Sequence, residues 1–279
     1  MYIGIDIGGT HTRVATGENG KIYEKMDFPT KGFEETVDLI TTAIDKLSRV
    51  DVTQVGVSVA SPINYRKRVL LRPPNLPNQD SWEGKNLGDT LSKRLNIHTV
   101  VAHDASVAAL AVAKYGVGKG KSPVLYYTVS TGIGCGLIID GEIFNGIINP
   151  EAGHQIINKG GPRHPGAPEG DLESISSGSA LKRLYDKNPV EVEGTPEWLE
   201  AMDWLAIGLT NSILHFSPEI LVISGGMTKH GEVFFGPLKK SLSKYLKFVP
   251  KVEVLPAKLG QDVSLIGAIT LAERSSPDK

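Results

Sequence analysis

The chain has 279 residues, and its 30 Lys and Arg against 31 Asp and Glu give a net charge of -1. This balance leaves no basic surplus for nucleic acid or anionic lipid, and the single cysteine, Cys135, excludes an internal disulfide and a metal cage of several thiolates. No apolar run reaches the ~18 residues that a membrane span needs. Two cores are expected, because single cores rarely exceed roughly 250–300 residues. We therefore expect a cytoplasmic protein with a small-molecule partner and with no nucleic-acid or membrane partner.

Strands and helices alternate in the first half of the chain. Ile3 to Ile7 is an apolar run with the carboxylate Asp6 inside it, and the segment over 12–15 would complete a hairpin with it. Apolar residues at helical spacing predict a helix over 34–49. A strand over 52–60, a short helix over 87–95, a strand that ends within 98–105 and an Ala-rich helix stopped by Gly116 follow. The long connection over 61–82 is rich in Pro and Asn, but its apolar residues and Trp82 predict that it is ordered.

The second half opens as the first does, with a strand, a glycine-rich turn and a strand over 124–146. Asp140-Gly141 between apolar runs predicts a hairpin of type I′. A long helix over 197–216 is predicted to bury one face, and a strand over 220–226, a helix, a strand over 251–257 and a last helix over 264–274 follow. The face expected to be buried carries Leu199, Met202, Leu205, Leu209 and Ile213. The order of elements predicts two α/β lobes, with a ligand in the cleft between them.

Three glycine-rich turns each follow an apolar strand, at Gly8-Gly9-Thr10, 130–134 and 224–226. Glycine lacks the Cβ that would keep phosphate oxygens away, and successive N–H groups with Ser or Thr hydroxyls can replace phosphate hydration. Any one of these turns is more often an ordinary tight turn. Together they favour a nucleotide, with Asp6 near its metal ion.

His103 and Asp104 come where a predicted strand ends and a helix begins. Asp is a preferred N-cap, so a purely structural role is the simpler interpretation of Asp104. The functional interpretation is that its carboxylate accepts the proton of a substrate hydroxyl during phosphoryl transfer.

Polar residues of several kinds gather over 149–178, among them Glu151, His154 and Glu173. Such donors and acceptors suit a polyhydroxylated ligand. A metal site is the competing interpretation, since His164 and Asp171 could join His154 and Glu173 as ligands. The absence of thiolates makes it the weaker one.

The motifs "DIGGT", "HDASVAALA", "STGIGCG", "PEAGH" and "LESISSG" occur in this order over nearly the whole chain, which resembles the ROK family of sugar kinases and repressors. The resemblance implies an α/β fold of two ribonuclease-H-like lobes, of the actin-like ATPase and sugar kinase type, with an interlobe cleft. We expect an N-terminal lobe over 1–115, rejoined by a C-terminal helix over 264–279, and a C-terminal lobe over 116–263. The resemblance also implies that the protein binds ATP and Mg2+ and transfers phosphate to a sugar hydroxyl.

The family's functional residues map onto this sequence by motif. Asp104 matches the general base, and Asp6 would face Mg2+ through water. The phosphate and nucleotide positions correspond to Gly8, Gly9, Thr10, Thr131, Gly132, Gly225 and Gly226. The sugar-contacting positions correspond to Glu151, His154 and Glu173, and less closely to Ser61, Asn64, Asn75 and His103.

Three departures from the family pattern bear on the substrate and on zinc. His103 stands where the family commonly has the Asn that bonds a sugar hydroxyl, and Ala60-Ser61 stands where Pro-Gly is common. Many members carry a cysteine-rich zinc loop after the "PEAGH" position, whereas this loop has no cysteine, so we expect no zinc.

The resemblance thus implies an ATP-dependent hexose kinase acting at the 6-hydroxyl, as a homodimer. Glucose is the first expectation, followed by fructose, mannose and N-acetylmannosamine. The alternatives are a catalytically silent sugar sensor and a ROK-type regulator.

Overall fold

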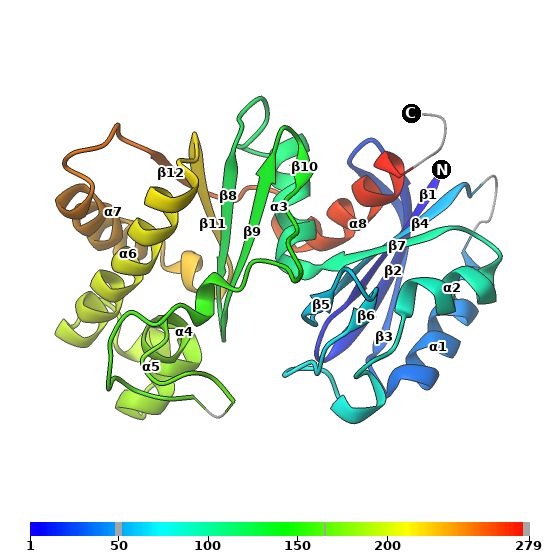
Figure 1. Ribbon diagram of the computed structural model, residues 1–279, viewed down its shortest axis with the longest axis horizontal. Helices are drawn as coiled ribbons and strands as arrows, with labels where there is room; N and C mark the ends of the chain where they lie inside the picture. The colour runs from blue at the N-terminus through cyan, green and yellow to red at the C-terminus, as the bar shows by residue number, and fades with distance from the viewer. Residues whose placement is uncertain (48–51, 165, 276–279) are drawn as a thin grey trace. The chain divides into compact units, whose positions relative to one another are not determined.

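The computed structural model describes residues 1–47, 52–164 and 166–275 (Figure 1). The chain forms two compact units, the first from 1–119, 141–149 and 259–279, and the second from 120–140 and 150–258. The first unit therefore ends at 119 rather than at 115, and it includes 141–149, which we had assigned to the second lobe. The predicted end of the helix near 49, Pro165 and the predicted helical residues 276–279 lie outside the described residues.

The first unit is built on one sheet with the strand order β3-β2-β1-β4-β7. β1 is antiparallel to β2 and parallel to β4, and β4 is parallel to β7. The predicted opening hairpin is thus the β1–β2 pair. The strands are β1 (Tyr2–Ile7), β2 (His11–Glu18), β3 (Lys21–Pro29), β4 (Gln54–Val59) and β7 (Thr99–His103).

Helices α1 (Phe33–Lys46), α2 (Leu87–Leu95), α3 (Asp104–Tyr115) and α8 (Val263–Arg274) accompany this sheet. α8 comes from the other end of the chain and packs against β1, β4 and α3 (Figure 1). Glycines make this close approach possible. A Cβ on Gly56 would lie 2.0 Å from the Ala268 carbonyl oxygen, and a Cβ on Gly267 would lie 2.1 Å from the Val107 carbonyl oxygen.

The connection between β4 and α2 is ordered, as its apolar residues predicted. It contains the two-stranded pair β5 (Ile63–Asn64) and β6 (Val69–Leu70) and the 3-10 turn η1 (Gln79–Ser81). Trp82 is fully buried, meets Phe33 edge to face at a centroid distance of 5.3 Å, and donates its Nε1–H to the Pro77 carbonyl at 3.1 Å.

The second unit repeats this strand arrangement. β8 is antiparallel to β9 and parallel to β11, which is parallel to β12, so the strands lie in the order β9-β8-β11-β12. The bounds are β8 (Val124–Val129), β9 (Ile133–Ile139), β11 (Ile220–Ser224) and β12 (Glu253–Pro256). Asp140 and Gly141, with φ of 52° and 79°, turn the chain after β9 toward β10 (Glu142–Ile143), as a type I′ turn requires.

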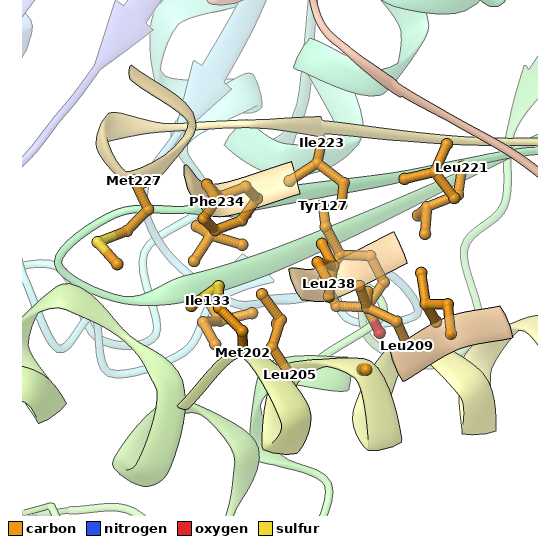
Figure 2. Packing of buried hydrophobic residues seen from close by; sticks show 14 of the residues in the cluster. Tyr127, Ile133, Met202, Leu205, Leu209, Leu221, Ile223, Met227, Phe234 and Leu238 are labelled. Carbon is orange, nitrogen blue, oxygen red and sulfur yellow. The ribbon is translucent and has the colours of Figure 1, made fainter. Parts of the chain in front are cut away.

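The remaining helices of the second unit are α4 (Leu172–Ser176), α5 (Gly178–Tyr185), α6 (Pro196–Phe216) and α7 (Glu232–Tyr245). The short 3-10 segments η2 (Ala152–His154), η3 (Pro189–Glu191) and η4 (Gly226–His230) belong to the same unit, and η5 (Gly260–Asp262) precedes α8. Met202, Leu205 and Leu209 of α6 pack with β8, β9, β11 and α7 in the core of this unit (Figure 2).

The prediction that Leu199 lies on the buried face of α6 is wrong, because 48% of this residue is exposed. Trp198 takes the buried position at this turn of the helix instead, and its Nε1–H donates to the Val233 carbonyl at 2.9 Å. The predicted α/β class with two related units is confirmed. No helix in the described ranges is both long and apolar enough to cross a bilayer.

Candidate active site

Asp6 lies where β1 is flanked by two other strands. The register places it opposite Arg13 on β2 and opposite Ser58 on β4. Arg13 donates to Asp6 Oδ2 from Nη2 at 2.7 Å and from Nε at 3.3 Å, and the Ser58 hydroxyl donates to Oδ1 at 2.9 Å. The residue is 8% exposed. A buried carboxylate is tolerated here because both of its oxygens have partners.

The pKa of Asp6 shows how strongly burial acts on it. Burial raises this pKa above its ordinary value, and the Arg13 guanidinium and the hydrogen bonds from Arg13 and Ser58 oppose that rise without cancelling it. The negative charge of Asp104 adds to the rise. Asp6 and Asp104 therefore act on one another within the first unit.

The donor set around Asp6 fits Mg2+ held through water. Oδ2 accepts both hydrogen bonds from Arg13, whereas Oδ1 accepts only the Ser58 hydroxyl and keeps a further lone pair. Mg2+ usually retains several waters and takes only one or two carboxylates directly. A metal-bound water could therefore reach Asp6 without breaking the contact to Arg13.

The first glycine turn joins β1 to β2 and is held by its own backbone. The Gly8 N–H donates to the His11 carbonyl at 3.0 Å, so Gly8 contributes the shape of the turn. A Cβ on Gly9 would lie 2.6 Å from the Asn75 carbonyl oxygen, which explains why glycine stands there. Among the described residues, the N–H groups of Gly9 and Thr10 have no protein acceptor. These two N–H groups are the ones that can meet phosphate.

Asp104 is the first residue of α3, and His103 occupies the N-cap position without a capping bond from its side chain. The structural interpretation of Asp104 as an N-cap is therefore wrong, because the helix begins at Asp104 itself, one residue earlier than that role requires. Asp104 Oδ1 accepts the Ala105 N–H at 2.7 Å, and His103 Nε2 lies 3.2 Å from the same oxygen. The Asp104 side chain is 40% exposed.

The less closely matched sugar positions of the first unit differ in how accessible they are. Ser61 is fully buried, and its hydroxyl lies 3.1 Å from each of the Pro62 and Leu71 carbonyl oxygens. Asn64 accepts the Lys67 N–H at 3.0 Å, and Asn75 is exposed beside Gly9. Asn75 is thus the best placed of the three to meet a ligand.

In the second unit, the backbone of Ile133 organises the predicted sugar residues. Its N–H donates to Glu173 Oε2 at 2.7 Å, and its carbonyl oxygen would lie 2.0 Å from a Cβ on Gly153. Gly153 stands between Glu151 and His154, so only glycine lets this segment approach the start of β9. The structure brings Glu151, His154 and Glu173 close enough that both glutamates act on the pKa of His154.

His154 is held by Asp171, a carboxylate that the sequence offered only as a possible metal ligand. Its Nδ1 lies 2.7 Å from Oδ2 of the fully buried Asp171, whose Oδ1 accepts the Ser174 N–H at the start of α4. Since a carboxylate only accepts, Nδ1 carries the proton and Nε2 is left for a ligand. Burial alone would lower the pKa of His154, but the hydrogen bond to Asp171 and the charges of Glu173, Asp171 and Glu151 raise it.

The second and third glycine turns also offer backbone groups. Within the described ranges, the N–H groups of Thr131 and Gly132 have no protein acceptor, whereas the next N–H in the chain, that of Ile133, belongs to Glu173. Gly225 has a φ of 99°, and a Cβ there would lie 2.3 Å from the Val129 carbonyl oxygen. Glycine is therefore required at the end of β11.

The loop between His154 and α4 is held by hydrogen bonds. The Gly170 carbonyl accepts the N–H groups of Ile157 and Asn158, and the Gly170 N–H donates to the Pro162 carbonyl. The described residues contain no group of three or more His, Cys, Asp or Glu side chains that could hold a metal ion. Cys135 lies in β9, where burial raises the pKa of its thiol to about 12.

The ROK family matches residues 2–275. The chain belongs to the ROK family. The resemblance predicted from the motifs is thus confirmed.

Named relatives are similar to this chain, in sequence or in structure, over nearly its full length. The Glucokinase of Thermotoga maritima is 29% identical over 307 residues, which cover 96% of each chain. The crystal structure of a ROK hexokinase from Thermus thermophilus has a TM-score of 0.90 at 26% identity, over 100% of this chain and 99% of that one. A ROK glucokinase from Streptomyces griseus in complex with glucose and AMPPNP has a TM-score of 0.80 at 27% identity, over 98% and 99%.

Sequence reasoning missed Arg13 and Ser58, and it considered Asp171 only as a possible metal ligand. Arg13 and Ser58 become partners of Asp6 only through strand register, and Asp171 reaches His154 only because the intervening loop folds back. Arg13 had a weak signal, since it lies seven residues after Asp6 across a predicted hairpin.

Proposed function

We propose that this chain is an ATP-dependent hexose kinase that transfers the γ-phosphate to a sugar hydroxyl, with Asp104 as the general base. The observation that carries the proposal is the Asp104 carboxylate, which is half exposed at the end of β7 and has one oxygen held by the protein. A base that must take a proton from a substrate needs this combination of a fixed and an accessible oxygen. The relatives named above support the reaction class.

The residues of each unit have separate tasks in the proposed reaction. In the first unit, Asp104 takes the hydroxyl proton, the N–H groups of Gly9 and Thr10 bind phosphate oxygens, and Asp6 meets Mg2+ through water. Bound Mg2+ supplies neutralisation of phosphate charge. In the second unit, Thr131, Gly132 and the turn at Gly225-Gly226 bind the nucleotide.

Glu151, His154 and Glu173 are proposed to bind the sugar. His154 presents Nε2 as an acceptor for a sugar hydroxyl while its ring is neutral, because Asp171 takes the other ring nitrogen. Glu173 keeps Oε1 available while Oε2 holds the Ile133 N–H. We propose glucose as the first substrate, with transfer to the 6-hydroxyl, and fructose, mannose and N-acetylmannosamine as further candidates. Cytoplasmic location and a homodimer belong to the same proposal.

The rival function is a sugar sensor without catalysis, favoured by His103 and Ser61 where the family commonly differs. An ADP-release assay across the four sugars, with wild-type chain and Asp104→Asn, separates the two. We expect turnover in the wild type and a fall in kcat of about 100-fold or more in the variant, because Asn is isosteric but cannot take the proton. The melting temperature should hardly change, since Asn can also accept the Ala105 N–H. ADP release by the variant at the wild-type rate would refute Asp104 as the base, and no release by the wild type on any sugar would favour the sensor.

A further inference from the structure

Gln155, the residue that follows His154, uses its side chain to join two elements of the second unit. Its Nε2 donates to the Ala152 carbonyl at 2.8 Å and to the Gly208 carbonyl at 3.2 Å, and its Oε1 accepts from Asn211 Nδ2 at 3.1 Å. Since carbonyl oxygens only accept, the amide must turn its nitrogen toward them and its oxygen toward Asn211. Gln155 thus ties η2 to one turn of α6.

The main chain of Gln155 binds the segment that carries another predicted sugar residue. Its carbonyl accepts the Leu172 N–H at 3.0 Å, and the next residue, Ile156, forms an antiparallel bridge with Asp171. Leu172 begins α4 and directly precedes Glu173. Gln155 is therefore bonded to α6 by its side chain and to α4 by its main chain.

The turn of α6 that Gln155 contacts also supports α4. A Cβ on Gly208 would lie 2.5 Å from Leu172 Cδ2, so glycine leaves room for the start of α4 at this point. The same glycine supplies the carbonyl that Gln155 binds. Leu205 and Leu209 beside it are buried in the core of the second unit, so this turn of the helix is itself firmly held.

We infer that Gln155 is a positioning residue for sugar recognition. It sets the spacing between His154 and Glu173 by tying η2 and α4 to the same turn of α6. Both N–H bonds of its amide already have acceptors within the protein, so Gln155 acts through its neighbours and donates nothing to the sugar. This inference rests on the proposed sugar-binding role of His154 and Glu173.

Two substitutions test this role while nearly preserving the shape of the side chain. Gln155→Met removes all three hydrogen bonds of the amide, and Asn211→Leu removes only the one that Oε1 accepts. For each of the four sugars that the wild type binds, we expect the Kd measured by calorimetry to rise about 10- to 100-fold in Gln155→Met, because displacing the binding groups by about 1 Å costs this much. Asn211→Leu should show a smaller rise. The sugar KM should rise in the same way, while the ATP KM and the kcat at saturating sugar stay within about threefold of the wild type.

Tyr245→Phe is the matched control. The Tyr245 hydroxyl donates to Asp203 Oδ2 at 2.8 Å, so this variant also removes a hydrogen bond from α6, but one that leads to α7 instead of η2. It should lower the melting temperature and keep the wild-type sugar Kd. Melting temperatures also establish that each variant is folded at the temperature of the binding measurement.

Weaker sugar binding by a folded Gln155→Met chain, with wild-type binding by Tyr245→Phe, supports the inference. It is overturned if Gln155→Met binds sugar as the wild type does, if Tyr245→Phe weakens binding equally, or if the ATP KM rises as much as the sugar KM. Should Gln155→Met fail to fold, Asn211→Leu decides, and an unchanged sugar Kd there overturns the inference.

The wild type and two further variants identify a failure of the proposed function itself. A wild-type chain that binds none of the four sugars removes that function and the inference with it. If the wild type binds sugar but His154→Ala and Glu173→Ala leave the Kd unchanged, the residues that Gln155 positions are not sugar contacts. A wild-type chain whose sugar binding depends on His154 and Glu173 but not on Gln155 leaves the proposed function standing and overturns the inference alone.

Discussion

At the scale of the residue, His154 owes its charge state to Asp171. The Asp171 carboxylate is fully buried and joins His154 Nδ1 to the start of α4. The folded chain favours the imidazolium, because the pKa of His154 is raised above its ordinary value of 6.5. The stability gained from this proton is therefore complete below about pH 6.5 and is lost as the pH rises through the raised pKa.

We predict that Asp171→Asn lowers the pKa of His154, because the charge that opposes the effect of burial is gone. The variant keeps an oxygen that can accept the Ser174 N–H, so α4 should remain capped. An NMR titration of the His154 ring measures the shift. Asp186→Asn is the matched control, since Asp186 is exposed and ends α5 in a left-handed conformation that Asn also adopts. An unmoved His154 pKa in a folded Asp171→Asn chain would show that Asp171 does not control this proton.

At the scale of the element, η2 and α4 both contact the main chain of Ile133, the first residue of β9. The Ile133 N–H binds Glu173, and its carbonyl oxygen leaves no room for a side chain at 153. The position of both predicted sugar-binding segments therefore depends on main-chain groups, and the side chain of Ile133 points into the core (Figure 2).

Gly153→Ala should accordingly shift η2 away from β9. The added Cβ would lie 2.0 Å from a backbone oxygen, which cannot move as a flexible side chain can. We expect a loss of about 1–3 kcal/mol in the free energy of unfolding, measured by urea denaturation, and a higher KM for sugar. Gly146→Ala is the control, because its nearest neighbour would be at an ordinary 3.6 Å. Equal stability of the two variants would contradict this account of the motif.

At the scale of the whole molecule, the exposed apolar residues of α6 bear on assembly. Leu199 and Leu214 are 48% and 42% exposed on α6, whose buried face carries Trp198, Met202, Leu205, Leu209 and Ile213. If the chain forms the proposed homodimer, light scattering over the micromolar range should give twice the 30.0 kDa mass of the chain. Leu199→Glu should shift the mass toward 30.0 kDa if α6 lies in the interface. A single mass near 30.0 kDa for the wild type would refute the dimer.

Much of this architecture was predictable from the sequence, since hairpins, helices and motif order are encoded locally. The partners of Asp6 were not, because Arg13 and Ser58 meet it through the pairing of three strands whose register the sequence does not state. The role of Asp171 depends on how the loop between His154 and α4 folds back, which the sequence does not state. Leu199 and Trp198 are neighbours, and either would fit an apolar face. In the structure Trp198 is the buried one, and its indole N–H donates to the Val233 carbonyl, a contact that the sequence does not show.

The last helix has a consequence for the order in which the chain can fold on the ribosome. α8 packs against β1 and β4, so the core of the first unit stays incomplete until the segment from 259 has been made. The second unit ends at 258 and has all its strands and helices before that point. Translation therefore completes the second unit before the first. Until α8 has been made, β1 and β4 lack the helix that packs against them at Gly4 and Gly56. A chain stopped at residue 258 should have one protease-resistant unit, the second, and an unprotected N-terminal half.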